Sequence, residues 1–195
     1  MIPMTKATVE DFSFKNIQSW SRNVTLNDGT KVLLRAQRPS DQEPLWEMVS
    51  TLSDDTLTQL VDRFTHELIE NWIKALDYDK ILPIMAFEPD GRVVGDATIH
   101  FYPSEGRKHI GAFGIFIHDD YQGRGLGSQL TRLMIEIGRL KGLHKMILEV
   151  FTTNERAIHV YEKCGYVVEG CMKKEIWHYL IKEFKDVYRM AFYLQ

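Results

Sequence analysis

The stretch Gln122-Gly123-Arg124-Gly125-Leu126-Gly127 is the most informative part of this chain. An apolar, strand-like run at residues 110–117 precedes it, and a helix is predicted after it because apolar residues recur at spacings of three and four. The apolar positions of this helix are Leu126, Leu130, Leu133, Met134, Ile137 and Leu140. Glycines at a helix start leave backbone N–H groups bare at the positive end of the helix dipole. The stretch therefore predicts a cradle for a phosphate or pyrophosphate group.

Composition limits the class of protein. A chain of 195 residues with 44% hydrophobic residues has the size and apolar content for one domain with a real core. Its net charge of −3 argues against non-specific nucleic-acid binding, which uses a basic face. Cys164 and Cys171 follow no metal-ligand spacing and are too few for a disulfide framework. With no signal-peptide pattern and no apolar run of ~18 residues, the sequence predicts a cytoplasmic protein without metal, nucleic-acid or membrane binding.

The order of elements predicts an α+β domain. Residues 1–20 are expected to form an N-terminal arm, and residues 21–195 a single domain. A hairpin is expected over residues 23–37, with Asn27-Asp28-Gly29 as its turn. Further strands are expected at residues 81–87, 93–102, 108–117, 146–151, 166–177 and 187–194, and helices over about 41–50, 56–75, 126–141 and 155–164. Only the unit at residues 110–151 demands a parallel crossover, so a mixed sheet is predicted and not a doubly wound one.

Several phosphate-binding motifs compete for the glycine stretch. A nucleoside-triphosphate P-loop is excluded because Gln129 follows Gly127-Ser128 and the loop contains no lysine. A dinucleotide loop fits at Gly123 and Gly125, with Ser128 in the third glycine position and Glu149 placed as a ribose-binding acid. A nicotinamide-dependent enzyme therefore stays open as an alternative, as does a glycine-rich turn without a ligand, although that turn would cost chain entropy.

Two motifs resemble those of one family. The pattern Gln122-x-x-Gly125-x-Gly127 resembles the acyl-CoA pyrophosphate loop of the GCN5-related N-acetyltransferase (GNAT) superfamily. Residues 115–121 before it resemble the family's strand and linker into the loop. Residues 154–166, an Asn-capped helix that ends in Tyr161-x-x-x-Gly165-Tyr166, resemble its second signature, and the end of the chain resembles its closing hairpin. The resemblance covers about residues 31–194.

This resemblance implies both a fold and an activity. The fold would be a GNAT-like central mixed, mostly antiparallel sheet of about seven strands, with about four helices on its faces. The activity would be transfer of an acetyl group from acetyl-CoA to a primary amine by direct attack in a ternary complex. The acceptor would be a small amine, an amino acid, or a protein lysine or N-terminus. A catalytically silent acyl-CoA sensor on the same fold is the alternative, and the oligomeric state is open, with a homodimer among the options.

The resemblance also assigns site residues. The pyrophosphate contacts fall on Gln122, Gly123, Arg124, Gly125, Leu126, Gly127 and Ser128. The backbone of Ile115, Phe116 and Ile117 would pair with the pantetheine arm like an added strand, and an N–H there would polarise the thioester carbonyl. Asn154 would bond the same arm, besides capping its helix. Tyr161 would lie near the CoA sulfur and give a proton to the departing thiolate.

The resemblance identifies the general base less clearly than it identifies the CoA contacts. Many relatives carry a glutamate on the strand before the loop, and Phe113 stands in that place here. His109 is the catalytic candidate instead, because a histidine pKa suits the task; it would act alone or in a relay with His100. Two half-exposed strand histidines with water as the base are the alternative. Four acids are candidates to receive a cationic amine, or are plain solvated surface: Asp54, Asp55, Asp62 and Glu67.

Overall fold

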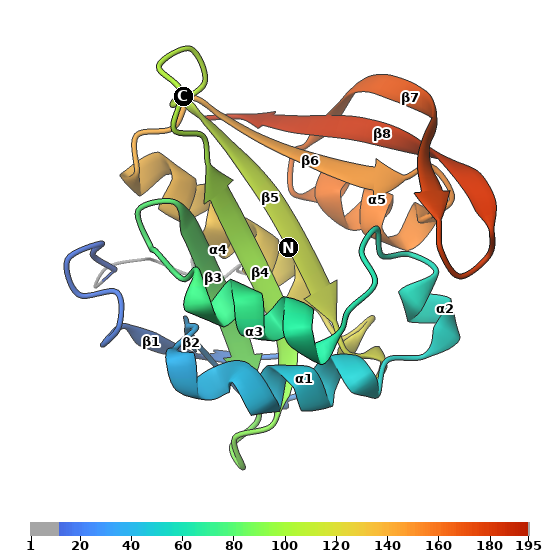
Figure 1. Cartoon of the computed structure of the whole chain (residues 1–195). Helices are drawn as coiled ribbons and strands as arrows, with labels where there is room; N and C mark the ends of the chain where they lie inside the picture. Colours follow the sequence, from blue (N-terminus) through green and yellow to red (C-terminus); the bar gives the residue numbers. More distant parts are fainter. Residues whose placement is uncertain (1–11, 195) are drawn as a thin grey trace.

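One continuous sheet runs through the computed structural model, which describes residues 12–194 (Figure 1). Its strands are β1 (Ser21–Thr25), β2 (Lys31–Ala36), β3 (Ile81–Phe87), β4 (Val93–Phe101), β5 (Ile110–Ile117), β6 (Lys145–Phe151), β7 (Val167–His178) and β8 (Glu183–Tyr193). They are ordered β1-β2-β3-β4-β5-β6-β8-β7. Every pairing is antiparallel except that of β5 with β6. The predicted mixed, mostly antiparallel sheet is confirmed. The sheet has eight strands and not about seven, because the hairpin of β1 and β2 is added to its edge by the pairing of β2 with β3.

Helices cover both faces of the sheet. They are α1 (Gln42–Ser50), α2 (Asp54–Leu57), α3 (His66–Lys74), α4 (Leu126–Leu140) and α5 (Glu155–Lys163). In Figure 1, α1 and α3 lie in front of the sheet, whereas α4 and α5 lie behind it. The four longer helices match the prediction, except that the second one begins only at His66, where Thr65 caps it by accepting from the Leu68 N–H. No helix within residues 12–194 has the length and apolarity needed to cross a bilayer.

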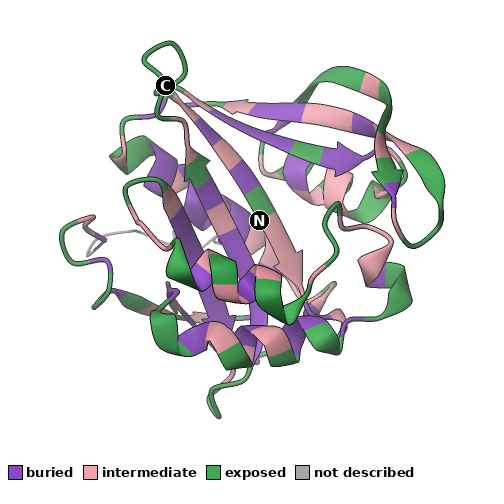
Figure 2. Ribbon diagram, in the orientation of Figure 1, coloured by how far each residue is buried: buried purple, intermediate pink, exposed green. Residues whose placement is uncertain are grey.

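The sheet separates two apolar clusters, and Figure 2 shows the buried residues gathered in its central strands. The front cluster joins side chains of α1 and α3 to Met85 of β3. The back cluster joins α4 to β3, β4 and β6. The predicted stripe of α4 is buried from Leu126 to Ile137, but Leu140 is 55% exposed. The last turn of α4 instead places Gly138 so close to Met146 and Leu194 that an added Cβ would lie 3.0 and 3.2 Å from them.

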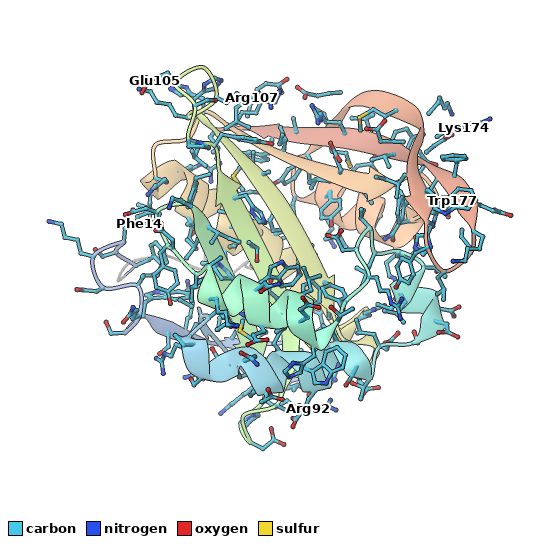
Figure 3. All side chains as sticks on the ribbon, in the orientation of Figure 1. Phe14, Arg92, Glu105, Arg107, Lys174 and Trp177 are labelled. Carbon is cyan, nitrogen blue, oxygen red and sulfur yellow. The ribbon has the colours of Figure 1, made fainter. Side chains whose placement is uncertain are left out.

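Part of the expected N-terminal arm belongs to this core. Phe12, Ile17 and Trp20 are buried in the back cluster, and the rings of Phe12 and Trp20 meet edge to face at 5.3 Å. Phe14, labelled in Figure 3, lies 6.5 Å from the ring of Phe101 on β4. Residues 12–20 therefore pack as a leading segment of the domain. The rest of the predicted arm, residues 1–11, lies outside the described residues.

The feature that positions the site is the separation of β5 from β6. The two strands pair over only three residues each, Ile110–Ala112 with Lys145–Ile147. Beyond that, β5 continues along β4 while β6 continues along β8, and the two strands diverge (Figure 1). The His118 N–H donates to the Val94 carbonyl on the β4 side. Because peptide groups alternate sides along a strand, those of Phe113, Ile115 and Ile117 face the gap.

Candidate active site

A pocket of about 630 Å³ occupies the gap and continues on both faces of the sheet. We call its back part the rear groove, formed by Gln122, Gly123, Gly125, Gly127, Ser128, Asn154, Arg156, Tyr161 and Lys163. We call its front part the front chamber, formed by Gln59, Asp62, Phe64, Trp72, Ile81, Pro83, Asp96, Thr98, His100 and Phe116. One cavity thus connects the glycine loop with the space under α3.

The glycine loop has the backbone that a diphosphate cradle requires. Gly123 and Gly125 take φ values of +74° and +92°, a conformation that favours glycine, and Gly125 caps the fifteen-residue helix α4. A Cβ on Gly127 would lie 3.3 Å from the Ile117 side chain. Glycine at these positions keeps the first N–H groups of α4 uncovered, so the residues present fit an anionic group.

Arg124 does not point into the pocket. Its guanidinium donates to Asp28 Oδ2 at 2.5 Å, to Thr30 Oγ1 at 2.6 Å and to the Asp120 carbonyl at 3.0 Å. Arg124 is absent from the pocket wall, while its carbonyl accepts from the Asn27 N–H. Its expected place beside a pyrophosphate is therefore corrected: Arg124 fastens the loop to the β1–β2 turn, and Asp28 already offsets its charge.

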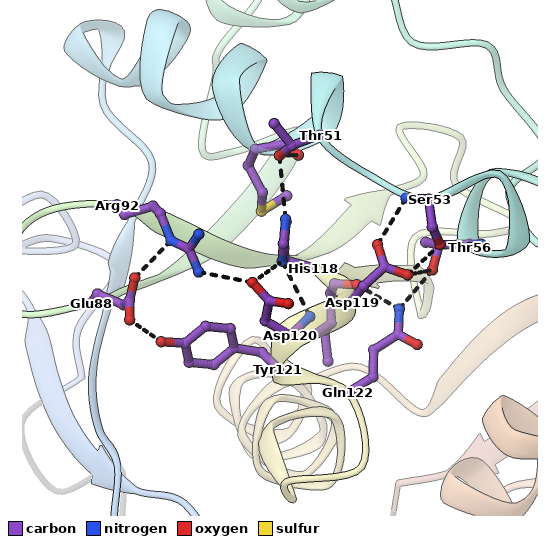
Figure 4. Close-up of polar contacts among 12 residues, drawn as sticks. Thr51, Ser53, Thr56, Glu88, Arg92, His118, Asp119, Asp120, Tyr121 and Gln122 are labelled. Carbon is purple, nitrogen blue, oxygen red and sulfur yellow. Dashed lines mark hydrogen bonds and ion pairs between the residues drawn. The ribbon is translucent and has the colours of Figure 1, made fainter.

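A polar network fixes the end of β5 against α2 (Figure 4). Asp119 accepts from Ser53 Oγ at 2.5 Å, from the Ser53 N–H at 2.9 Å and from Thr56 Oγ1 at 2.6 Å. The Gln122 amide donates to Thr56 Oγ1 and to the Ile117 carbonyl, both at 2.9 Å. Burial raises the pKa of Asp119, but the hydrogen bonds from Ser53 and Thr56 outweigh it and hold that pKa at about 2. The side-chain amide of Gln122, which was predicted to contact the pyrophosphate, therefore donates its hydrogen bonds to protein atoms instead.

Asp119→Asn should lower the free energy of unfolding at pH 7 by about 1–2 kcal/mol, because charge-assisted hydrogen bonds are replaced by neutral ones. Since the pKa of Asp119 is depressed in the folded state, its contribution is complete above about pH 4 and is lost as the pH falls toward 2. Urea unfolding at pH 7 and pH 3 measures this difference. Asp55→Asn, an exposed change on α2, is the control, and a gap between Asp119→Asn and wild type that is the same at both pH values would contradict the assignment.

Asn154 and Tyr161 both line the rear groove. Asn154 caps α5 by accepting from the Ala157 N–H at 3.1 Å, as predicted from the sequence. Tyr161 is 8% exposed, with its ring 6.2 Å from that of Phe113 and 6.0 Å from that of Tyr166. No residue within 12–194 hydrogen-bonds its hydroxyl, and burial raises the pKa of Tyr161. The phenol therefore stays protonated and available as a donor.

His109 lies away from this pocket. It is exposed next to the β4–β5 turn, whose Glu105 and Arg107 are labelled in Figure 3, and its ring faces that of His144 at 6.3 Å. The register pairs His100 with Ala112, so the two histidines are not cross-strand neighbours. The expected relay is corrected: His100 lines the front chamber and His109 does not.

Within residues 12–194, no group of three or more His, Cys, Asp or Glu side chains is arranged to hold a metal ion.

Asp96 is the site residue that sequence reasoning missed. It lies on β4 between Met85 and Phe116 of the adjacent strands, lines the front chamber and is only 5% exposed. Thr98 Oγ1 donates to it at 2.8 Å, and it forms no ion pair with any residue in the described part of the chain. Burial raises the pKa of Asp96 to about 7. The signal was present in the sequence: Asp96 is the one charged residue in residues 93–99, a strand-like segment that is otherwise uncharged and mostly apolar.

Of the four acids expected at the acceptor wall, Asp62 lines the pocket. The other three, Asp54, Asp55 and Glu67, are exposed residues outside its wall. Lys185 Nζ donates to the Thr58 carbonyl at 2.7 Å, and the buried His178 ring bonds the Leu60 carbonyl at 3.1 Å. These contacts from the β7–β8 hairpin hold the α2–α3 loop, which carries Gln59 and Asp62, over the front chamber.

Comparison with known proteins agrees with this geometry. The model of the Acetyltransferase (GNAT) family matches residues 46–166, more than half of the chain. This protein belongs to the GNAT family. The L-amino acid N-acetyltransferase AaaT of Escherichia coli K12 is 38% identical over 105 residues, which are 52% of this chain and 62% of that relative. The chain thus matches less than two thirds of that protein.

Solved structures extend the likeness to most of the GNAT fold. A GNAT-family acetyltransferase from Streptococcus pneumoniae is 30% identical with a TM-score of 0.70, over 84% of this chain and 99% of that one. Spermidine N-acetyltransferase from Vibrio cholerae, solved with CoA and spermine, has a TM-score of 0.71 at 21% identity, over 83% and 95% of the two chains, and shares the fold. With one parallel strand pair in the described sheet, the fold lacks the parallel sheet that the nicotinamide-dependent alternative requires.

Proposed function

We propose that this protein transfers an acetyl group from acetyl-CoA to a primary amine. The observation that supports this best is the gap between β5 and β6, which opens directly beside the glycine loop. The loop offers N–H groups to a diphosphate, and the gap offers the peptide group of Ile115 and the Ile117 N–H to an extended pantetheine arm, because the Ile117 carbonyl is already bonded to the Gln122 amide. The gap then leads into the front chamber, where a second substrate has room.

The backbone groups of β5 point alternately to its two edges, one toward β4 and the other toward the gap. By the alternation of peptide groups, Ile115 and the Ile117 N–H serve the gap, whereas the backbone of Phe116 bonds β4 and its ring walls the front chamber. Leu126 is fully buried, so among the predicted contacts it contributes its backbone. When bound, acetyl-CoA supplies the thioester carbon that the amine attacks. A gap-facing N–H of β5 is the group placed to stabilise the oxygen of that carbonyl.

Two side chains on opposite sides of the gap handle the protons. The amine arrives as an ammonium and loses two protons as the carbon–nitrogen bond forms and the carbon–sulfur bond breaks. Asp96, with a pKa near neutrality, accepts the first proton and passes it to solvent. Tyr161 donates a proton to the sulfur, and the second ammonium proton replaces it. The net products are the amide, the free thiol and one proton.

Tyr161→Phe should lower kcat by about 10- to 100-fold, within the range of acid–base contributions, while leaving the affinity for CoA within twofold. Thiol release measures kcat, and calorimetry measures CoA affinity. Tyr166→Phe is the matched control, since Tyr166 is also buried beside Phe113 but lies outside the pocket wall, with a hydroxyl that has no partner. If kcat of Tyr161→Phe equals kcat of Tyr166→Phe, Tyr161 is not the general acid.

The proposed function is tested in two steps on the whole chain. Acetyl-CoA and CoA should raise the melting temperature, and NAD(P) should not. Thiol release from acetyl-CoA should then depend on an added amine. Stabilisation by CoA without thiol release for any amine tested would favour the silent sensor, and no stabilisation by CoA would contradict both readings.

A further inference from the structure

Three aromatic rings line the front chamber. The ring of Phe64 meets that of Trp72 edge to face at 5.6 Å and that of Phe116 at 5.0 Å. These rings come from three separate elements, the α2–α3 loop, α3 and β5, and all three line the pocket. Aromatic faces attract a cation and also pack against an apolar chain.

Two buried acceptors of the front chamber, on Asp96 and Gln59, have fewer hydrogen-bond donors than they can accept. Asp96 is nine-tenths buried and receives one hydrogen bond, from Thr98. Gln59 Oε1 is buried without any hydrogen-bond partner. Asp62 adds an exposed carboxylate at the rim. Buried acceptors of this kind are costly unless a donor arrives, so these atoms point to a ligand that brings N–H groups.

Cationic side chains are missing from this chamber, within the described residues. The lysine and arginine of the pocket wall, Lys163 and Arg156, both lie on α5 in the rear groove. Lys185 is engaged by the Thr58 carbonyl, and Arg63 is exposed outside the pocket wall. A substrate carboxylate in the front chamber would therefore find no lysine or arginine among the described wall residues and would face the carboxylate of Asp96.

We propose that the acceptor is a small primary amine of the form R–CH₂–NH₃⁺, with an apolar R group and no carboxylate on the carbon that bears the reacting nitrogen. This inference rests on the proposed function and narrows its substrate. The ammonium lies against Asp96 and Gln59, and the R group lies along Phe64, Trp72 and Phe116. Free α-amino acids are disfavoured because their carboxylate would be desolvated without a cation.

Matched pairs of acceptors test this, each pair differing by one carboxylate. We compare 2-phenylethylamine with phenylalanine and 3-methylbutylamine with leucine, using thiol release from acetyl-CoA by the full chain. The amine of each pair should have a kcat/KM at least 100-fold higher. A peptide with one internal lysine is the third arm, and a kcat/KM for it above that of both free amines would overturn the assignment to a small amine.

Two variants of Gln59 give a second readout. Gln59→Leu removes the unpartnered oxygen and should raise KM for 2-phenylethylamine at least fivefold, whereas Gln59→Glu should lower it; KM for acetyl-CoA should stay the same in both. Amino acids used as well as, or better than, their amines would overturn the inference while leaving acetyl transfer intact. Failure of every acceptor despite tight acetyl-CoA binding would overturn it too. Absence of acetyl-CoA binding would instead show that the proposed function fails.

Discussion

Asp96→Asn is expected to lower kcat/KM for amine acetylation at pH 7 by about 100-fold or more, because general base catalysis contributes factors of this size. The affinity for CoA should not change, since Asp96 lies in the front chamber and not beside the glycine loop. The wild-type rate should rise with pH through about 7, as the carboxyl group ionises, and the variant should lack that rise. His100 is the other titratable side chain on this face of β4, Asp62 lies at the rim, and the cross-strand neighbours Met85 and Phe116 are uncharged.

The same substitution should stabilise the protein. The pKa of Asp96 is raised in the folded state, so ionisation opposes folding. This cost is absent below about pH 4, grows as the pH rises, and levels off above about pH 7. Asp96→Asn should therefore be more stable than wild type at pH 8, on the order of 4 kcal/mol, and equal to it near pH 4. Denaturant unfolding at both pH values measures the difference.

Asp62→Asn is the control for Asp96→Asn, because it removes an exposed carboxylate from the same chamber. We expect it to change kcat/KM less than fivefold and to leave the shape of the pH profile intact. If Asp96→Asn lowers kcat/KM, raises the stability and removes the rise in rate with pH, the results agree with Asp96 as a buried general base. An Asp96→Asn protein with wild-type kcat/KM and pH profile would exclude this role.

Gly125→Glu should weaken CoA binding by more than 100-fold. The new carboxylate would stand where a diphosphate is expected, and like charges at a desolvated site cost several kcal/mol. The φ of +92° adds about 1–2 kcal/mol of strain for a residue with a Cβ. The added Cβ would also come within 2.8 Å of the flexible Asn27 side chain. Calorimetric titration of CoA measures the loss.

Gly91→Glu controls for that strain. Gly91 has a nearly identical φ of +95° in the β3–β4 turn, with open space around its Cβ position. The Gly91→Glu protein should lose about as much stability as the Gly125→Glu protein, but it should bind CoA with the wild-type affinity. If both glutamates weaken CoA binding equally, the effect is one of folding; if neither does, the diphosphate is not held at this loop.

Local patterns predicted most of the fold. The bounds of β3 follow from an apolar run between a helix end and the turn at Pro89-Asp90-Gly91, and α4 follows from spacing alone. Residues 12–20 could not be placed, because Phe12, Ile17 and Trp20 are buried by contacts distant in sequence. The exposure of Leu140 has the same origin. Periodicity places it on the apolar stripe, but the neighbours that could cover it are set by the tertiary fold.

The site was predictable where its chemistry resides in the backbone and less so elsewhere. The glycine loop and the Asn154 cap depend on local conformation, which residue type determines. His109 was misplaced because the register of β4 with β5 sets its neighbours, and a shift of a few residues in the turn moves it out of reach of His100. Arg124 was misread because its partners Asp28 and Thr30 lie almost a hundred residues earlier.

Hydrogen exchange of the whole chain, measured with and without saturating CoA, tests the central claim most directly. The account predicts slower exchange at two places at once: the gap-facing amides of Ile115 and Ile117, and the amides of residues 123–128 at the start of α4. Unchanged exchange at both places, in folded protein at millimolar CoA, would contradict it.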